Sequence, residues 1–299
     1  MGIRGGVPEG SPPQAGAAPG PEFVAVGHVA RDRMPSGYRL GGTAAYAACT
    51  AARLGLRAAL VTRAAPFAPL DALATEVTVY NAGSPRSTTF ENVYEGGQRC
   101  QYLHARAQPL AAADVPASLR QAPIVLFGPV AQEMQPDLLD CARSATIRAV
   151  VPQGWLRTWD ADGLVRPVAW READSIRGRC DVLVLSVDDL QGVPQPLAAW
   201  QRLAPFVVIT RGREGAEVYA DARLIHRARA YRASEVDPTG AGDVFAAALA
   251  IGLHQRGDPV WAADFACAAA AFAIESPGLA GIAPRPQVLE RMAADDRVQ

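Results

Sequence analysis

Six short apolar runs, separated by longer segments with helical spacing, constrain the fold of this chain more than any other feature. The runs are FVAVGHV (23–29), AALVTRA (58–64), PIVLFGPV (123–130), IRAVVP (147–152), DVLVLSV (181–187) and FVVITRG (206–212). Each is rich in Val, Ile and Leu and apolar on both faces, which is typical of interior strands of a parallel sheet. Helices are predicted at 42–54, 132–145, 194–204, about 240–256 and 259–275. The pattern predicts a layered α/β domain with helices on both faces of the sheet.

One segment, residues 86–107, departs from this rhythm. Its sequence, RSTTFENVYEGGQRCQYLHARA, is enriched in Thr, Phe, Val and Tyr, alternates polar and apolar residues in places, and has a Gly96-Gly97 turn in its middle. These features predict an antiparallel hairpin that projects from the α/β body. We expect the hairpin to act as a lid or as the surface of a homodimer. A plain edge hairpin is the alternative.

The composition excludes several classes of function. The chain has 299 residues and a net charge of −1, with 29 basic and 30 acidic residues mixed along the sequence, so nucleic acid is not an expected partner. Every basic residue is Arg, which removes Schiff-base chemistry and the lysine of a Walker-type phosphate loop. The five cysteines lack the spacing of a zinc site or a disulfide framework.

No apolar stretch is long enough to span a membrane, and the chain does not open on a signal peptide, so we expect a cytoplasmic protein without a membrane partner. Residues 1–22 are mostly Gly, Pro and Ala with hardly a bulky side chain. Such a segment cannot offset the entropy of ordering, and we expect it to be a disordered tail. The folded domain is predicted over residues 23–299.

A dense motif, DPTGAGD (237–243), directly precedes an apolar, Ala-rich run. If a helix starts at or just after Thr239, the amides of residues 240–242 are among its unpaired N-terminal donors, at the positive end of the helix dipole. Glycine at two of these positions lets the backbone approach a phosphate oxygen closely. A carboxylate at Asp243 beside this anion site is positioned as a general base. Taken alone, the same acid could serve only the helix dipole.

At these residues the sequence resembles the ribokinase-like sugar kinases, also called the phosphofructokinase B family. There the counterpart of DPTGAGD forms an anion hole and ends in the catalytic Asp. The resemblance implies that Asp243 deprotonates the acceptor hydroxyl while the amides of Gly240, Ala241 and Gly242 stabilise charge on the γ-phosphoryl group. It extends over nearly all of 23–286. The fold it implies is a three-layer ribokinase-like domain with a mostly parallel central sheet and a small antiparallel β lid.

The N-terminal stretches GHVARD and GGTAAYAACTAARLG resemble the acceptor pocket of that family. An Asp after the first strand and a Gly-Gly turn line that pocket, and these correspond to Asp32, Gly41 and Gly42. A carboxylate suits the role because it can accept hydrogen bonds from two vicinal hydroxyls. Tyr46 stands where the family often has an Asn that holds a sugar hydroxyl. We therefore expect an acceptor other than ribose held in the usual way.

Three further polar side chains are expected at the acceptor. Gln153 follows a predicted strand at the carboxyl edge of the sheet, where open α/β sheets bind ligands. Within the hairpin, Arg99 and Gln101 share a face, and only one face can point into the site. The stretches TTFEN and ESPGLAGI resemble a branch of kinases that act on inositol or nucleosides, so such an acceptor is slightly favoured.

Two glycine-containing stretches are assigned to the nucleotide by the resemblance. TRGREG resembles the family's TxGxxG segment, which implies that Thr210 and Gly212 lie near the phosphates and that Gly215 turns into the next strand. Thr239 is expected beside them. ESPGLAGIAP, with Gly278, resembles a closing loop beside the adenine and a monovalent-cation site. In isolation, a β-turn explains the glycines of TRGREG equally well.

ATP and Mg²⁺ are the cofactors that the resemblance implies. The family's Asn-x-x-Glu element, which organises water around Mg²⁺, corresponds to Ser186 and Asp189, so the carboxylate is kept one methylene shorter. Asp188 is an alternative ligand. Asp237 and the closing loop mark the implied site of a monovalent cation, and the sequence leaves open whether K⁺ is needed.

These features predict an ATP-dependent kinase that phosphorylates a hydroxyl of a small polyol, sugar or nucleoside. One alternative is a catalytically silent nucleotide- or sugar-binding protein of the same fold, because the Mg²⁺ element is altered. A dinucleotide-dependent oxidoreductase is a weaker alternative, since no GxGxxG follows the first strand.

Overall fold

The computed structural model describes residues 19–95, 98–193 and 197–298. Within them, a nine-stranded sheet has the order β15-β14-β13-β12-β9-β8-β1-β4-β5. Its strands are β1 (Phe23–Val26), β4 (Ala58–Thr62), β5 (Thr78–Asn81), β8 (Ile124–Phe127), β9 (Ile147–Val150), β12 (Val182–Ser186), β13 (Phe206–Thr210), β14 (Ala216–Ala220) and β15 (Arg223–Ala228). The strands from β5 to β13 in this order are parallel, and β14 is antiparallel to both of its neighbours, β13 and β15. All six predicted runs are strands of this sheet.

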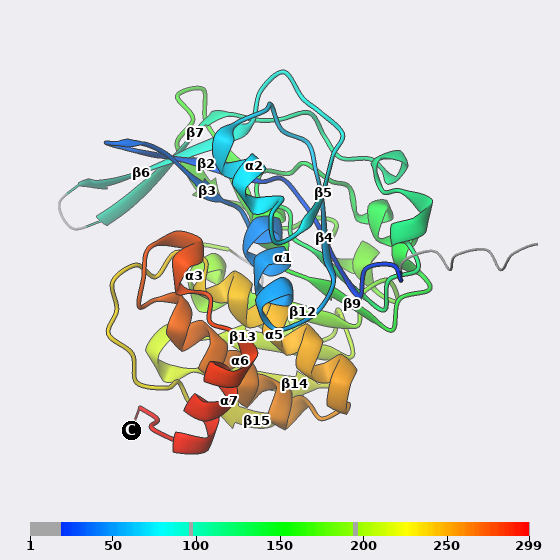
Figure 1. The fold of residues 1–299 in the computed structure, drawn as a ribbon, viewed down its shortest axis with the longest axis vertical. Helices are drawn as coiled ribbons and strands as arrows, with labels where there is room; N and C mark the ends of the chain where they lie inside the picture. The colour runs from blue at the N-terminus through cyan, green and yellow to red at the C-terminus, as the bar shows by residue number, and fades with distance from the viewer. Residues whose placement is uncertain (1–18, 96–97, 194–196, 299) are drawn as a thin grey trace, which may run out of the picture.

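One face of the sheet is covered by the long helices of the chain (Figure 1). They are α1 (Thr43–Arg53), α5 (Ala241–Arg256) and α6 (Pro259–Ala273), with α7 (Arg285–Ala294) packed on α6. The helices α1, α5 and α6 are Ala-rich, and small side chains let the axes approach closely. A Cβ on Gly252 of α5, for example, would lie 3.0 Å from the Cα of Ala262 in α6. The predicted helices at 42–54, 240–256 and 259–275 therefore agree with the structure.

The opposite face is covered differently from the prediction. The described part of the chain has only short helices there: α3 (Val187–Leu190), α4 (Leu197–Trp200) and 3₁₀ turns such as η3 (Pro136–Ala142). The helices predicted over 132–145 and 194–204 are thus wrong in length, and 194–196 lie outside the described residues. Pro136 disfavours helical backbone at the residue before it, which limits the first segment to η3. A stack of Trp155, Trp170 and Trp200 fills much of the space, with ring centroids 4.9 and 5.9 Å apart.

A second, four-stranded sheet lies over one end of the body (Figure 1). Its order is β3-β2-β6-β7, with β2 (Ala30–Met34), β3 (Gly37–Gly41), β6 (Thr88–Glu95) and β7 (Gln98–Ala105). The predicted hairpin is β6–β7, and its Gly96-Gly97 turn lies outside the described residues. The hairpin β2–β3 was not predicted, although the Pro35-Ser36-Gly37 turn signals it. We call these four strands the lid sheet.

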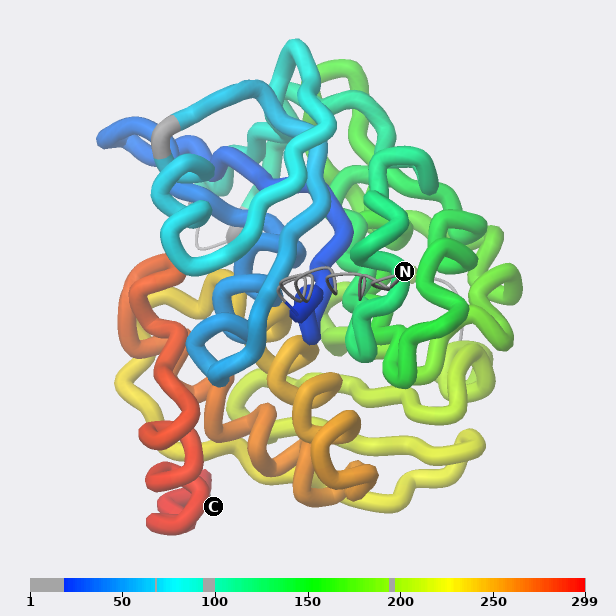
Figure 2. Tube along the Cα trace, turned by 45° about the vertical axis from the view of Figure 1, so that its right-hand side comes forward, coloured from blue at the N-terminus to red at the C-terminus, as the bar shows by residue number. Residues whose placement is uncertain are grey.

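The remaining elements complete the two sides of the body. They are α2 (Ala68–Leu73) and the small pair β10 (Arg157–Trp159) and β11 (Val165–Pro167). Figure 2 shows the middle of the chain, in green, on one side and α5 to α7, in orange and red, on the other. No helix among the described residues is long and apolar enough to cross a membrane. Of the predicted tail, residues 1–18 lie outside the described part of the chain.

Candidate active site

A cavity of about 1010 Å³ opens at the carboxyl ends of the parallel strands, between the body and the lid sheet. Ser186 and Thr210, the last residues of β12 and β13, are register partners and both line it. The start of α5 lines it next to them, and the lid sheet contributes Asp32 and Gln101. Open α/β sheets bind ligands at this edge, because loops and helix N-termini meet there.

The floor of the cavity is the first turn of α5. Gly240 is its N-cap, with φ at 83°, and no side chain caps the helix. The first intrahelical hydrogen bond runs from Val244 N to Gly240 O (2.9 Å), so the amides of Gly242 and Asp243 precede the helical ladder. The Ala241 amide donates a longer bond, 3.3 Å, to Pro238 O. The backbone here therefore presents to the cavity amides that have no acceptor among the described residues, together with the positive end of a buried 16-residue helix.

Asp243 lies in this first turn, and its side chain lines the cavity. Burial raises the pKa of this carboxyl to about 7, and the Thr43 hydroxyl acts in the opposite direction. The nearby charges of Asp189 and Asp32 raise the pKa further, whereas Arg157 lowers it. A carboxyl with a pKa near neutrality can both accept and release a proton at physiological pH.

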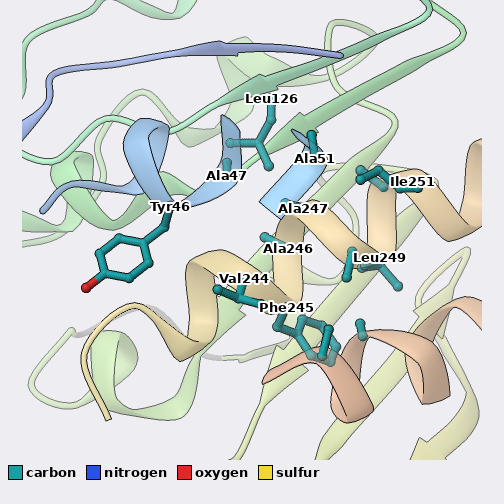
Figure 3. Close-up of a cluster of buried hydrophobic side chains, with 14 of the residues drawn as sticks. Tyr46, Ala47, Ala51, Leu126, Val244, Phe245, Ala246, Ala247, Leu249 and Ile251 are labelled. Carbon is teal, nitrogen blue, oxygen red and sulfur yellow. The ribbon is translucent and has the colours of Figure 1, made fainter. Parts of the chain in front are cut away.

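Tyr46 of α1 lies under the anion site and not in the cavity. Its ring packs on Gly240 so closely that a Cβ there would lie 2.1 Å from the ring Cε1. Figure 3 shows Tyr46 of α1 in the same buried cluster as Val244 and Phe245 of α5. The side chain is 1% exposed, and its hydroxyl has no hydrogen-bond partner among the described residues. Burial, followed by the charge of Asp243, raises its pKa well above the usual range. Tyr46 thus does not line the cavity, unlike Asp32, Gly42, Gln101 and Gln153. Its contact explains why residue 240 is glycine.

The lid end of the cavity is polar. Asp32 of β2 lines it together with Phe90 and Asn92 of β6 and Gln101 of β7. Gln101 Nε2 donates to Asn92 Oδ1 at 3.1 Å across the hairpin. Gly41, on the neighbouring strand, does not line the cavity but makes room for the acid, since a Cβ there would lie 2.2 Å from Asp32 Oδ2.

Two other predicted acceptor residues differ in their position. Gly42 lines the cavity at the start of α1, with φ at 93° and its Cα facing the backbone of His28. Arg99 belongs to β7 opposite Tyr94, near the end of the hairpin, and its side chain lies outside the described part of the chain. The predicted pairing of Arg99 with Gln101 at the substrate therefore stays a prediction.

A polar cluster on the sheet edge joins the two ends of the cavity. Gln153 Nε2 donates to Asp189 Oδ1 at 3.0 Å, and Arg157 Nη2 lies 3.8 Å from the same oxygen. Ser186 caps α3 by accepting a hydrogen bond from Asp188 N at 3.1 Å. All five residues line the cavity. The two adjacent carboxylates, Asp188 and Asp189, are the donor set that Mg²⁺ prefers when substrate phosphates supply its other ligands.

The far end of the cavity, away from the lid sheet, has an apolar wall bordered by the charged residues Arg213, Arg232 and Glu235. Thr210, Gly212, Gly215 and Thr239 line its approach. Residue 215 must be glycine for two reasons: its φ is 93°, and a Cβ would lie 2.0 Å from Ala228 O. The apolar wall is formed by Ala230, Tyr231, Phe245, Cys267, Ala270, Ala271, Ile274 and Val298. Val298 is held by its amide, which donates to Ala230 O at 2.9 Å.

Asp237 and Gly278 do not line the cavity but lie together behind the anion site. Asp237 Oδ1 accepts from the Thr239 amide at 3.0 Å, and Oδ2 accepts from Arg39 Nη1 at 2.6 Å. The Arg39 side chain also lies over Gly278, where a Cβ would be 3.0 Å from its Cδ.

Three residues of the site were not predicted from the sequence: Thr43, Arg39 and Val298. Thr43 directly follows the Gly-Gly turn, so its place in the cavity could have been inferred from that turn. The position of Arg39 could not have been inferred, because this residue belongs to a hairpin and lies 198 residues away from Asp237 in the sequence. Val298 reaches the cavity only through pairing of the last residues with 230–232, for which the sequence carries no signal.

Comparison with known proteins finds relatives of this chain among kinases. A family model described as pfkB family carbohydrate kinase matches residues 163–286. A cytidine kinase of Thermococcus kodakarensis is 26% identical over 257 residues, which cover 80% of this chain and 90% of that protein. An inositol 3-kinase of Zea mays is 33% identical over 146 residues, 48% of this chain and 38% of that protein.

Solved structures show the same fold. A pyrophosphate-dependent kinase of the ribokinase family, complexed with a pyrophosphate analogue and myo-inositol, has a TM-score of 0.73 at 21% identity, over 90% of this chain and 99% of that one. Arabidopsis thaliana ribokinase, complexed with ribose and ATP, has a TM-score of 0.68 at 18% identity, over 91% and 99%. The predicted resemblance to this family and the predicted ribokinase-like fold are confirmed.

Proposed function

Because residues 163–286 match the pfkB carbohydrate kinases and the chain has the ribokinase fold, we propose that it transfers the γ-phosphoryl group of ATP to a hydroxyl of a small polyol, sugar or nucleoside. We take 23–299 as a single kinase domain. One observation carries the proposal: Asp243, with a raised pKa, lies beside unpaired helix amides in the same cavity as the polar lid residues and the apolar far end. Acid, anion site, acceptor pocket and donor pocket are thus adjacent.

Asp243 is the proposed general base. As the hydroxyl oxygen attacks the γ-phosphorus, the carboxylate takes the hydroxyl proton, and the bond from the γ-phosphorus to the bridging oxygen of ADP breaks. Such proton transfer contributes on the order of 10² to 10⁴ in rate. The pKa near 7 supports this role, since the base is largely ionised just above neutrality and still basic enough to accept a proton.

Charge that develops on the transferred group is stabilised by the start of α5. The amides of Gly240, Ala241 and Gly242 are the proposed donors, with Ala241 sharing or releasing its long bond to Pro238 O. Gly242 has open space on its Cα face, so a phosphoryl oxygen can come close. In the absence of Lys, Arg157 is the cationic side chain that lines this part of the cavity beside Asp189.

Mg²⁺ fits the residues present. Asp188 and Asp189 lie at the cavity wall, and Ser186 and Gln153 hold them in place by hydrogen bonds. We propose that these carboxylates hold the ion through water, with the donor phosphates completing its shell. When bound, Mg²⁺ neutralises negative charge on the phosphates.

The apolar far end supports a nucleotide as donor. A purine ring needs an apolar slot, and the wall from Tyr231 to Val298 offers one, whereas inorganic pyrophosphate has no group to place there. Thr210, Gly212, Gly215 and Thr239 lie between this wall and the anion site, where we place the phosphates. Gly278 does not line the cavity: its amide interacts with Asp237, which also accepts a hydrogen bond from the Thr239 amide.

The polar lid end supports an acceptor with several hydroxyls. Asp32 can accept two hydrogen bonds, and the Asn92–Gln101 pair offers an amide donor and acceptor. Phe90 supplies one apolar surface. The inositol and cytidine kinases among the relatives make an inositol or a nucleoside the favoured acceptor.

The test is a two-way screen of donor and acceptor with the purified chain and Mg²⁺. ATP, GTP and pyrophosphate are each combined with myo-inositol and other inositols, cytidine and other nucleosides, ribose and hexoses. We expect ADP release and a phosphorylated product, identified by mass spectrometry, with ATP and one acceptor class. The Asp243→Asn variant is the blank.

Two results would contradict the proposal. Product formation with pyrophosphate and none with ATP would overturn the donor assignment. Tight ATP binding without turnover on any acceptor would favour a silent nucleotide-binding protein, which the altered Mg²⁺ element also permits.

A further inference from the structure

An ion pair behind the anion site joins the lid sheet to the loop that opens α5. Arg39 Nη1 lies 2.6 Å from Asp237 Oδ2, and the two side chains are 27% and 16% exposed. Arg39 belongs to β3, and Asp237 is the first residue of the DPTGAGD motif. Because both side chains are largely shielded from water, the pair is a stronger constraint than a typical surface ion pair.

The carboxylate of Asp237 is surrounded by donors. Besides Arg39, the Thr239 amide donates to Oδ1 at 3.0 Å. Burial alone would raise the pKa of this carboxyl, but the Thr239 hydroxyl and amide, the Arg39 charge and the Gly278 amide together lower it. Asp237 is therefore a carboxylate that accepts hydrogen bonds from both Arg39 and its own loop.

This arrangement does not fit the monovalent cation that the sequence resemblance implied at Asp237. A bound K⁺ needs several oxygen ligands, but here N–H groups point at the carboxylate from two elements of the chain. The aliphatic part of the Arg39 side chain also lies over Gly278 of the closing loop, with only 3.0 Å between Cδ and the position of a Cβ there. A cation at Asp237 would meet the positive charge of Arg39.

The same guanidinium balances a cluster of acids around the anion site. The charges of Asp243, Asp32 and Asp237 act on the Tyr46 hydroxyl in one direction, and that of Arg39 acts in the other. Arg39 is also the register partner of Asp32 across β2 and β3, so both side chains stand on the same face of the lid sheet. One arginine thus neighbours the acceptor acid and holds the first acid of the anion-site loop.

We propose that Arg39 is a positioning residue that takes the place of a diffusible monovalent cation, so that phosphoryl transfer by this chain is independent of K⁺. Its guanidinium fixes Asp237, and Asp237 in turn fixes the Thr239 amide and the turn that presents Gly240–Gly242 to the phosphoryl group. The inference rests on the proposed function, because it concerns the same anion site.

The test compares K⁺ with the tetramethylammonium ion, which is too large for such a site, at matched ionic strength. Turnover and melting temperature are measured for the wild type, Arg39→Met, Arg39→Lys and the control Arg33→Met. Arg33 is another arginine of the lid sheet, but its side chain is 54% exposed and pairs with Glu91 at 3.5 Å. Within the described part of the chain, no hydrogen bond or ion pair joins Arg33 to the anion-site loop. Removing its side chain therefore tests for general effects on the lid sheet.

For the wild type and Arg33→Met, we expect the same kcat in both salts. Arg39→Met is expected to lose between about tenfold and 10²-fold in kcat in tetramethylammonium, because the anion-site turn is misplaced. K⁺ should restore several-fold of this loss and raise the melting temperature of Arg39→Met, but not of the wild type. Arg39→Lys keeps a fixed charge and should remain independent of K⁺.

Three outcomes would overturn the inference. They are stimulation of the wild type by K⁺, full activity of Arg39→Met in tetramethylammonium, and an Arg39→Met protein that K⁺ changes in neither kcat nor melting temperature. The melting arm does not need an acceptor. If the wild type turns over no substrate, the proposed function fails, and the melting data still decide whether removal of Arg39 creates a K⁺ site.

Discussion

The two structures that face each other across the cavity, the start of α5 and the lid sheet, are held in opposite ways. The turn at Gly240–Asp243 opens a 16-residue helix whose residues 244–253 are all buried, so it is anchored in the largest core of the body. Apart from Leu40 of β3, which belongs to the main core, the described lid sheet packs a small cluster against the body, Ala30, Phe90 and Leu103 with Val130 and Ala131. We infer that α5 fixes the chemistry and that the lid sheet adapts to the acceptor, so changes on the two sides should affect different kinetic constants.

Loss of the Asp243 carboxylate should have the largest effect. Asp243→Asn is expected to lower kcat by about 10² to 10⁴, because the hydroxyl proton has no acceptor. ATP affinity, measured by calorimetry, should change little.

Melting at pH 8 serves as the control for folding of Asp243→Asn. A carboxyl whose pKa is raised to about 7 in the fold contributes stability below its unfolded pKa that is lost as pH rises through 7. The neutral amide should therefore melt at or above the wild-type temperature at pH 8. Near-normal turnover by the variant would remove Asp243 as the base.

Gly240→Ala tests the rigidity of the α5 side directly. The new Cβ would lie 2.1 Å from the Tyr46 ring, at a residue whose φ is 83°. We expect a loss of about 10² in kcat from displacement of the turn and of a few kcal/mol in unfolding free energy, about 1–3 of it from overpacking.

Gly257→Ala is the matched control, because Gly257 caps the other end of α5 with φ at 65° and nothing within 4 Å of a Cβ. It should show only the backbone cost, about 1–2 kcal/mol, with unchanged kcat. Equal losses in the two variants would mean that the contact with Tyr46 does not position the turn.

The next prediction concerns the pH dependence of kcat/KM, which tests Asp243 on the α5 side. With the pKa of Asp243 raised to about 7, the ionised base is lost below that pH. We expect kcat/KM to fall about tenfold per pH unit below 7 and to level off above it. A profile that stays flat down to pH 5 would show that the base titrates in the ordinary carboxyl range.

A substitution in the lid sheet is expected to have the smallest effect on the kinetic constants. Gln101→Ala removes one hydrogen-bonding side chain, worth about 0.5–1.5 kcal/mol, so the KM for the acceptor should rise roughly 2- to 12-fold with little change in kcat. His104→Ala is the matched change on the same strand, at a side chain that pairs with Glu91 at 2.6 Å on the exposed side. A fall in kcat without a change in KM would place Gln101 with the chemistry instead.

Much of the body was predictable because its signals are local. Within the described residues, six of the seven parallel strands of the body are apolar runs, β5 being the exception, and the helices α1, α5 and α6 are Ala-rich segments between turn residues. DPTGAGD likewise carries its own glycine, acid and helix start within seven residues. The short helices of the other face were not predictable from spacing, since Pro136 and a tryptophan stack override a pattern that reads as helical.

Local sequence patterns were enough to predict the layered α/β body and the residues at the start of α5. Tertiary structure alone decided that Tyr46 lies beneath Gly240, that β2 and β3 join the predicted hairpin, and that Arg39 meets Asp237 across 198 positions. The physical reason is the distance along the chain over which each signal acts. Periodicity, helix dipoles and glycine turns act over a few neighbouring residues. An ion pair or a ring contact between distant segments exists only after the core has brought them together.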